Sequence, residues 1–443
     1  MSIQQKVASL LRSKVAKNAK WLIAGKIVHM ILAFLIGLLS ARYLGPGNYG
    51  LINYAGAYIS FFTAICTLGI NSIIVRNFVD HPEEEGETIG TAIALRMASS
   101  FLSMLMIIGI VSILNRDEPL TIVVTALCSI SLLFQVFDTL NYWFQSRYQS
   151  KYYAMATLIS YLVASAYRIV LLACGKDVRW FAIANAIDYA IAALFLYLMY
   201  RKCRGPKFSF SWRKASELLR SSRSFIIAGL MVSIYNSTDR LMLKQMMDEA
   251  SVGYYSSATH ICSMWVFILT AIIDSLYPSI MQLYNTDKEK YERTNRQLYA
   301  IVFYLSVFAS LAISLLASPI TLILYGEAYL PSAAPLRIMT WYTAFSYLGV
   351  ARNAWMVCEN KQKYLLPLYS GAALTNVVLN YIMIPIWGAS GAAAASLITQ
   401  ITTIFVFPSL IRELRPNAKM MLDAVLLRKI LPEKTKKSET AKK

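Results

Sequence analysis

Long apolar segments separated by short polar stretches recur along the whole chain. Within them the hydrophobic residues continue around all faces instead of alternating, which predicts membrane helices rather than strands. Many exceed the roughly 18 residues that cross a bilayer. We predict an all-α integral membrane protein with about 12 transmembrane helices, at residues 21–41, 51–75, 89–114, 119–143, 152–174, 180–200, 224–246, 252–283, 298–324, 332–358, 364–387 and 389–411.

Composition agrees with this pattern. Of the 443 residues, 57% are hydrophobic and 15% are charged, whereas soluble domains carry roughly 25% charged residues. This excludes a soluble enzyme, a disordered chain and, because the six cysteines are widely scattered, a disulfide scaffold. The net charge of +19 indicates membrane topology instead of nucleic-acid binding.

The basic residues lie almost entirely on one side of the predicted membrane. Sorting the connections by alternate side puts both termini on that side, and the positive-inside rule then predicts cytoplasmic N and C termini. The acidic loop at 80–87 is an exception, although acidic residues contribute little to the rule. The opposite loops are too short to carry a catalytic domain, so we expect no enzyme activity and no catalytic residues.

Short matches between the two halves predict an internal repeat. Ile23-Ala24-Gly25 precedes Gly50, and Ile227-Ala228-Gly229 precedes Gly253 at nearly the same spacing. Two parallel six-helix lobes around a central cleft follow from such a repeat. The expected organisation is an amphipathic cytoplasmic segment (1–20), an N-lobe (21–200), a basic cytoplasmic linker (201–223), a C-lobe (224–411) and a basic cytoplasmic tail (412–443).

Motifs for cofactors and metals are weak or missing from the sequence. Residues 45–50 match GxGxxG but follow an apolar helix rather than a strand, so we interpret them as a turn between the first two spans. A nucleotide-binding GxxxxGK[ST] loop does not occur. The three histidines have no partnering cysteines or HExxH pattern, which argues against a metal site. We therefore expect no cofactor.

Ionisable residues inside the predicted spans are the candidate functional groups. A charge at mid-bilayer costs at least roughly 2.5–3.5 kcal/mol on insertion scales, so such groups normally face a watery cavity or a partner. Basic residues outnumber acidic ones there, and arginine matches phosphate oxygens bidentately, which favours an anionic cargo. The predicted substrate-binding residues of a cationic cleft are Lys26, Arg96, Arg168, Arg240 and Arg352. The candidate ion-coupling residues are Asp188, Asp239, Asp274, His29 and His260.

Each of these residues also has a structural interpretation. Lys26 can snorkel to the headgroups, and Asp188 and Asp274 can form buried ion pairs with arginines as readily as they can bind a coupling ion. Asp138 is expected to be a structural hydrogen-bonding group near the cytoplasmic end of its helix.

Four stretches resemble a known family. These are Leu39 to Gly50, Thr238-Asp239-Arg240 leading to Val252-Gly253-Tyr254-Tyr255, Leu324 to Tyr329, and Asn376 to Asn380 followed by Ile384 to Ala393. In order and spacing they resemble the polysaccharide-transporter branch of the multidrug/oligosaccharidyl-lipid/polysaccharide (MOP) exporter superfamily, which includes Wzx-type O-antigen and repeat-unit flippases. The resemblance implies a two-lobed bundle with a cationic lumen that moves undecaprenyl-pyrophosphate-linked oligosaccharides. The acid and arginine cluster of the first helix in lipid II flippases is replaced here by Lys26 and His29, which argues against lipid II.

Together these observations predict a flippase of the bacterial plasma membrane that works by alternating access. Its cargo would be undecaprenyl-pyrophosphate-linked repeat units for O-antigen, capsule or exopolysaccharide synthesis, and a proton or sodium gradient would drive the cycle. Expected partners are the lipid-linked oligosaccharide, membrane lipids and other polysaccharide-assembly proteins, with no nucleic acid. The alternatives are an ion-coupled drug or metabolite antiporter of the same superfamily and a membrane-embedded polysaccharide-assembly enzyme.

Overall fold

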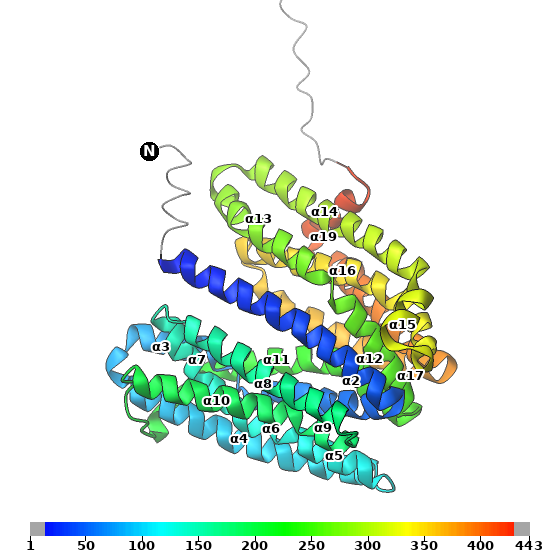
Figure 1. Cartoon of the computed structure of the whole chain (residues 1–443). Helices are drawn as coiled ribbons and strands as arrows, with labels where there is room; N and C mark the ends of the chain where they lie inside the picture. The colour runs from blue at the N-terminus through cyan, green and yellow to red at the C-terminus, as the bar shows by residue number, and fades with distance from the viewer. Residues whose placement is uncertain (1–13, 429–443) are drawn as a thin grey trace, which may run out of the picture. The chain divides into compact units, whose positions relative to one another are not determined.

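A computed structural model describes residues 14–428 of the chain, with side chains from residue 30 onward. This part is built from helices and contains no strand (Figure 1). The α-helices of the first half are α2 (Lys14–Cys66), α3 (Asn71–Asp80), α4 (Glu85–Leu114), α5 (Pro119–Ser129), α6 (Ser131–Gln135), α7 (Thr139–Ser146), α8 (Lys151–Ala173), α9 (Val178–Ala182), α10 (Ala184–Lys202) and α11 (Trp212–Met246). The second half contains α12 (Glu249–Ser263), α13 (Val266–Thr286), α14 (Lys288–Leu315), α15 (Ala317–Tyr325), α16 (Ala333–Cys358), α17 (Leu365–Ile401), α18 (Phe407–Leu410) and α19 (Arg415–Val425).

The prediction of an all-α membrane protein is confirmed. Among the described residues, nine helical segments are long and apolar enough to cross a membrane. Two of these segments are each broken by a glycine, α2 at Gly45 and α17 at Gly388. Each break divides one segment into two, and α16 is a further long helix outside the nine, so the helices are consistent with the twelve predicted spans.

The break at Gly45 decides between the two interpretations of the GxGxxG match. Gly45 has φ 69° and ψ 170°, a left-handed backbone conformation that glycine adopts without strain. Pro46 follows directly and starts a new helix, since its fixed φ suits a first turn and it needs no backbone donor there. The motif is therefore a turn between two helices, as predicted.

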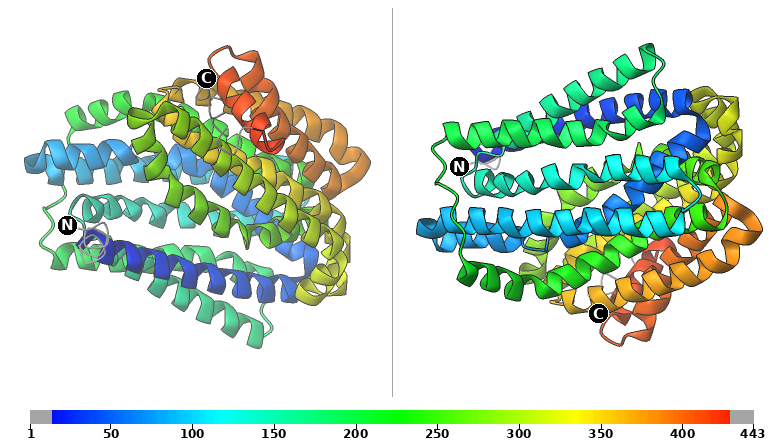
Figure 2. Two further views of the ribbon diagram at one scale, coloured as in Figure 1. Left: turned by 90° about the horizontal axis from the view of Figure 1, so that it is seen from above. Right: turned by 90° about the horizontal axis from the view of Figure 1, so that it is seen from below.

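The described residues pack as two compact units, unit 1 up to Ser256 and unit 2 from Ser257 onward. The sequence places its lobe boundary earlier, at the linker 201–223, whereas α11 packs against α2 and belongs to unit 1. Within unit 1, α8 lies side by side with α10 and also contacts α2 (Figures 1 and 2). Within unit 2, α14 and α16 form the central pair, and α13, α17 and α19 pack on them.

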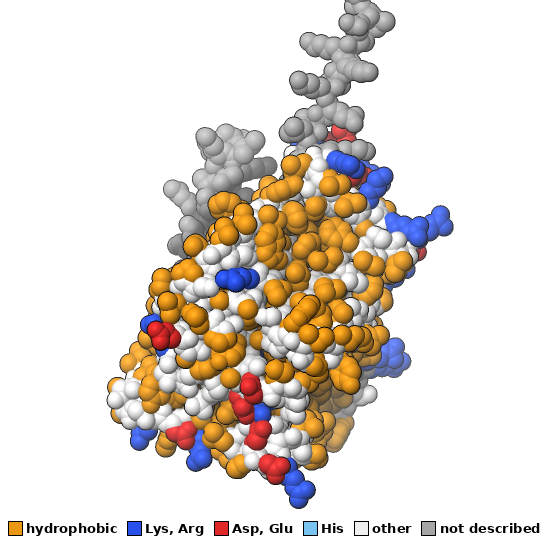
Figure 3. Space-filling model, turned by 90° about the vertical axis from the view of Figure 1, so that its right-hand side faces the viewer, with side chains coloured by type: hydrophobic (Ala, Val, Ile, Leu, Met, Phe, Trp, Pro, Cys, Tyr) orange, Lys and Arg blue, Asp and Glu red, His pale blue; other side chains and the backbone are white. Residues whose placement is uncertain are grey.

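Each unit has an aromatic core at one end. In unit 1, Trp143 packs edge-on against Phe144 and Tyr200. In unit 2, Tyr291, Tyr299 and Trp355 belong to one buried hydrophobic cluster. Many large apolar side chains remain on the outside, and Figure 3 shows hydrophobic side chains over much of one face, with charged ones gathered mainly toward its edges. Such a surface suits contact with lipid.

The linker between α10 and α11 is docked on α4. The Ser209 amide donates to the Gly86 carbonyl (3.1 Å), and the Ser211 amide donates to the Thr91 hydroxyl (3.0 Å). Gly90 permits the approach, because a Cβ at this position would lie 2.3 Å from the Ser209 carbonyl oxygen. The linker is thus a fixed part of unit 1.

The acidic loop neutralises the start of α11. Glu84 accepts from Arg213 at 3.0 Å and pairs with Lys214, whose side chain is almost fully buried. These two bonds, Lys214 first, hold the pKa of Glu84 below its usual value. This pairing explains why acidic residues occur in a loop on the side of the membrane that we predict to be basic.

Candidate functional site

A polar cluster inside unit 1 begins where the fourth predicted span departs from α-helical geometry. Val136–Asp138 form a single 3-10 turn between α6 and α7. Hydroxyl groups next to it bond back to the backbone: Ser131 donates to the Cys128 carbonyl and Thr139 to the Val136 carbonyl, both at 2.7 Å. Such bonds compete with the helical ladder and loosen it. The turn presents Asp138 and Thr139 to the neighbouring helices.

Arg96 on α4 points to this turn. Its guanidinium is 2% exposed and donates from Nη1 to the Thr139 hydroxyl at 2.9 Å. Its Nε has no hydrogen-bond partner among the described residues. Asp138 is close enough to act on Arg96 electrostatically, but the two do not form an ion pair.

Arg168 and Asp188 belong to the same cluster. Arg168 on α8 donates from Nη2 to the Asn185 amide oxygen at 2.7 Å and lies over the Tyr161 ring at 5.9 Å. Asp188 follows Asn185 by three residues on α10, so both lie on one helical face. The Asp188 carboxylate acts electrostatically on both Tyr161 and Asp138. Arg96 and Asp188 thus share Asp138 as a neighbour, and Arg168 and Asp188 share Tyr161.

Asp239 and Arg240 lie together on α11. The Asp239 carboxylate is buried and accepts a short hydrogen bond from the Tyr255 hydroxyl. Arg240 is half-buried, its Nε has no hydrogen-bond partner in the described part of the chain, and it acts electrostatically on Tyr49.

One turn further along α11, an ion-pair network ties three segments of unit 1. Lys244 Nζ lies 2.7 Å from Glu118 and 2.8 Å from Glu249. Glu118 also accepts from the Asn115 amide at 3.1 Å, and Gln245 donates to the Tyr54 hydroxyl at 2.7 Å. We name Lys244, Glu118 and Glu249 the Lys244 clamp. Sequence reasoning missed it because all three groups lie near helix ends, where charges are ordinary.

In unit 2, Arg352 on α16 is buried at 3% exposure. It donates from Nη1 to the Thr403 carbonyl at 3.3 Å, and its Nε has no hydrogen-bond partner in the described residues. Thr403 belongs to a π-helical segment, Thr402–Val406, and such segments occur frequently at functional sites. Tyr299 and Tyr369 are the ionisable groups that act on Arg352.

Four predicted site residues remain, His260, Asp274, Lys26 and His29. His260 on α12 shares a hydrogen bond between its Nδ1 and the Tyr325 hydroxyl (2.8 Å). Asp274 lies on an exposed face of α13. Lys26 and His29 lie in the backbone-described part of α2, but their side chains fall outside the described ones.

A buried amide pair in α17 was not predicted as a site. Asn380 donates to the Asn376 amide oxygen at 3.1 Å, and Asn376 donates to the Ser396 hydroxyl at 3.3 Å across the Gly388 break. The signal in the sequence is two asparagines four residues apart in an otherwise apolar helix. The local arrangement can orient a polar group inside unit 2.

Charge balance is the main chemical feature of these sites. Across the described residues, Arg96, Arg168, Arg240 and Arg352 have no carboxylate at ion-pair distance. In the same part of the chain, no group of three or more His, Cys, Asp or Glu side chains is placed to hold a metal ion. The arrangement can bind anions through uncompensated guanidinium groups.

Residues 15–284 match the family described as polysaccharide biosynthesis protein, which is more than half of the chain. The chain belongs to this family. Sequence relatives include the lipid II flippase MurJ of Bacillus subtilis (25% identical over 45% of this chain and 39% of the relative) and the probable flippase AglR of Haloferax volcanii (28%, 41% and 40%). These two matches span only about two fifths of each relative's length.

A third sequence relative is matched over a longer stretch. The succinoglycan biosynthesis transport protein ExoT of Rhizobium meliloti is 22% identical over 81% of this chain and 70% of its own. All three relatives are flippases or transport proteins rather than enzymes.

Solved structures agree on the fold. The lipid II flippase MurJ in an inward closed conformation has a TM-score of 0.69 at 14% identity, covering 92% of this chain and 91% of that one. An inward-facing multidrug resistance MATE transporter of the MOP superfamily has a TM-score of 0.66 at 16% identity, covering 89% and 96%. The chain therefore shares the fold of this flippase and this transporter, as the sequence resemblance implies.

Proposed function

We propose that the protein is a flippase that moves undecaprenyl-pyrophosphate-linked oligosaccharide repeat units across the bacterial plasma membrane by alternating access. Its product would serve O-antigen, capsule or exopolysaccharide synthesis. Both termini would be cytoplasmic, and the partners would be the lipid-linked oligosaccharide, membrane lipids and other polysaccharide-assembly proteins. Family membership, the MOP-type fold and the names of the relatives support this class of cargo.

The observation that carries the proposal is the set of arginines that have no carboxylate at ion-pair distance within the described residues. Burying a guanidinium without an opposite charge is costly, so a protein that keeps Arg96 and Arg352 buried has a use for their charge. Pyrophosphate is a multivalent anion whose oxygens accept paired hydrogen bonds from arginine. Orphan Nε donors on Arg96, Arg240 and Arg352 leave hydrogen-bonding capacity for such a group.

We propose that Lys26, Arg96, Arg168, Arg240 and Arg352 engage the pyrophosphate and acidic sugars in turn as the cleft between the lobes opens to each side. A proton or sodium gradient would reset the cycle. Asp188 is the coupling residue that we favour, because it acts electrostatically on Asp138, a carboxyl group that Arg96 also acts on. Asp239, Asp274, His29 and His260 are the further candidates for this role.

The test is a flipping assay with purified protein in sealed proteoliposomes. A fluorescent undecaprenyl-pyrophosphate oligosaccharide should become accessible from the opposite leaflet, faster under an imposed proton or sodium gradient. Arg168→Ala and Arg352→Ala should abolish flipping. Arg337→Ala is the matched control, because Arg337 lies in a predicted span but is exposed and donates to the Ser318 hydroxyl. Unchanged flipping in both test variants would refute the cationic site.

A drug or metabolite antiporter is the second candidate, since the fold also matches a multidrug transporter. In the same vesicles, gradient-driven export of a small cationic dye without flipping of any lipid-linked glycan would establish this alternative. The arginines would then be structural, and Asp188→Asn would be expected to stop dye export.

A further inference from the structure

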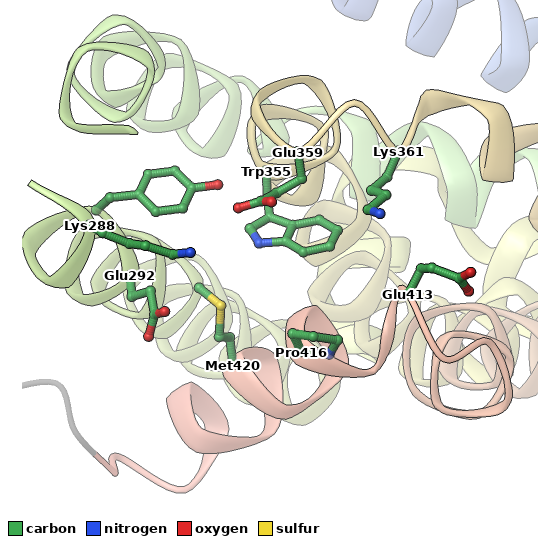
Figure 4. A pocket seen from close by; sticks show the side chains of 9 residues that line it. Lys288, Glu292, Trp355, Glu359, Lys361, Glu413, Pro416 and Met420 are labelled. Atoms are coloured by element: carbon green, nitrogen blue, oxygen red, sulfur yellow. The ribbon is translucent and has the colours of Figure 1, made fainter. Parts of the chain in front are cut away.

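A pocket of about 340 Å³ opens in unit 2, at one end of the helix pair α14 and α16 (Figure 4). The start of α14, the short connection after α16 and the first turn of α19 line it together. The side chains that matter here are Lys288, Tyr291, Trp355, Glu359, Lys361 and Glu413. Its volume lies within the roughly 300–1,000 Å³ of small-molecule sites. None of these residues belongs to the proposed transport site.

The floor of the pocket is apolar and aromatic. Trp355 and Met420 are buried there, and Pro416 of α19 lies beside them. Tyr291 is 1% exposed, and its hydroxyl makes no hydrogen bond to nitrogen or oxygen within the described residues, where the thiol of Cys358 is its neighbour. The Tyr291 hydroxyl thus has a weak acceptor, the thiol sulfur, as its neighbour.

The rim carries charges of both signs. Figure 4 shows Lys288 and Lys361 on opposite sides of the Trp355 indole, with Glu359 next to that indole. In the described part of the chain, these two lysines and Glu359 form no ion pair. Within the described residues, the pocket therefore has two ammonium groups and one carboxylate without an ion-pair partner.

The other two carboxylates of the rim are already engaged. Glu292 accepts from Arg296 at 2.9 Å. The pKa of Glu413 lies below its usual value, first because of a backbone hydrogen bond and further because of Tyr364 and the nearby Lys361. A smaller hollow of about 190 Å³ adjoins the pocket through Glu292, Pro416 and Met420.

We infer that this pocket binds a zwitterionic phosphate ester that carries a primary ammonium group, of the phosphoethanolamine class. The phosphate would lie between Lys288 and Lys361 and accept a hydrogen bond from Tyr291. The ammonium would pair with Glu359 at the face of Trp355, where a carboxylate and an indole together stabilise a cation. A purely anionic ligand would leave Glu359 facing its negative charge, and a purely cationic one would face both lysines.

Two sources can supply this chemistry, an aminophospholipid headgroup and a free phosphoethanolamine. The pocket lies at the end of helices predicted to span the membrane, where lipid headgroups are found. The connection after α16 is short, because α17 begins at Leu365. The inference is independent of the flipped cargo, because an undecaprenyl-pyrophosphate carries no ammonium.

The test measures binding to the purified full-length protein. In one arm, phosphoethanolamine and inorganic phosphate are titrated by calorimetry in detergent. In the other, native mass spectrometry counts retained phosphatidylethanolamine and phosphatidylglycerol. We expect the ethanolamine compound of each pair to bind at least tenfold more tightly. Binding in the lipid arm alone identifies a headgroup site, and binding in the soluble arm identifies a free ligand.

Variants separate the two ends of the ligand. Glu359→Gln should remove the preference for the ethanolamine compounds while leaving phosphate binding in place, and Lys361→Gln should weaken both by about tenfold. Lys363→Gln is the matched control, because Lys363 is exposed and does not line the pocket. Equal binding of ethanolamine and non-ethanolamine compounds, absence of binding in both arms, or an effect of Lys363→Gln equal to that of Lys361→Gln would each overturn the inference. Unaltered thermal unfolding of the variants excludes misfolding as the cause.

Discussion

Replacing Lys244 by methionine tests the Lys244 clamp. The substitution keeps most of the apolar stem of the side chain and removes its charge. Glu118 and Glu249 then lose a common partner that lies within 2.8 Å of both. These carboxylates belong to the connection between α4 and α5 and to the start of α12. The change therefore loosens three segments of unit 1 at once.

The expected loss follows from exposure. Hydrogen bonds to charged groups contribute about 1.5–3 kcal/mol when buried, and exposed ion pairs contribute about 0.2–1 kcal/mol. The ammonium is 5% exposed, while the two carboxylates are 40% and 30% exposed. An intermediate value of about 1 kcal/mol for each bond gives a total of about 2 kcal/mol. For a unit of this size that corresponds to a fall in Tm of roughly 4–8 °C.

Thermal unfolding of the purified protein in detergent measures the effect. Glu118→Gln should cause about half of the fall, and 1 M salt should reduce the difference from the parent protein because the pairs are partly exposed. Lys202→Met is the control, since Lys202 is exposed at the end of α10 and forms no ion pair in the described residues. If Lys244→Met unfolds within about 1 °C of the parent, the clamp contributes nothing and the reasoning is wrong.

Three further predictions concern the packing of unit 1. Gly253→Ala should destabilise the protein by about 1–3 kcal/mol, because its Cβ would lie 2.1 Å from a backbone carbonyl oxygen; Gly56→Ala, with open space around it, should have no such effect on Tm. Burial raises the pKa of Glu118, but hydrogen bonds from Lys244, Thr121 and Asn115, together with the charge of Lys244, outweigh burial and hold this pKa below its usual value of 4.5. The stabilising effect of the ionised Glu118 should therefore be lost as pH falls below about 4.5. An unchanged slope of Tm against pH in Glu118→Gln, over roughly pH 3–5, would contradict this. Gly90→Ala should detach the linker 203–211 and speed its proteolysis, and equal cleavage rates would show that the linker is held by other contacts.

The sequence was sufficient for features that depend on local pattern. Continuous apolar runs identified the spans, and the proline and glycines of residues 45–50 identified the turn at Gly45, because hydropathy and backbone restriction act within a few residues. α2 and α17 each consist of two helices that meet at a glycine, so counting every continuous helix as one span would give too few spans.

Features that depend on long-range packing were not accessible. The 3-10 turn at Val136–Asp138 shifts the helical phase, so no periodic pattern could have placed Asp138 beside Arg96. The packing of α11 on α2 likewise involves residues nearly two hundred positions apart. Sequence periodicity is read over windows of roughly 11–18 residues and carries no information about such distant contacts. Which of the arginines contact a substrate stays a prediction.

The docked linker has a mechanical consequence. The segment before α11 is hydrogen-bonded to α4, and the first turn of α11 is ion-paired to the acidic loop. The N-terminal end of α11 is thus held in place by these contacts, and bending has to occur further along the helix. Gly229 is the single glycine of α11, and helices bend most easily at glycine. Stiffness along this helix is therefore distributed unevenly, and the pliable region lies at Gly229, inside the predicted span 224–246, rather than at the docked end.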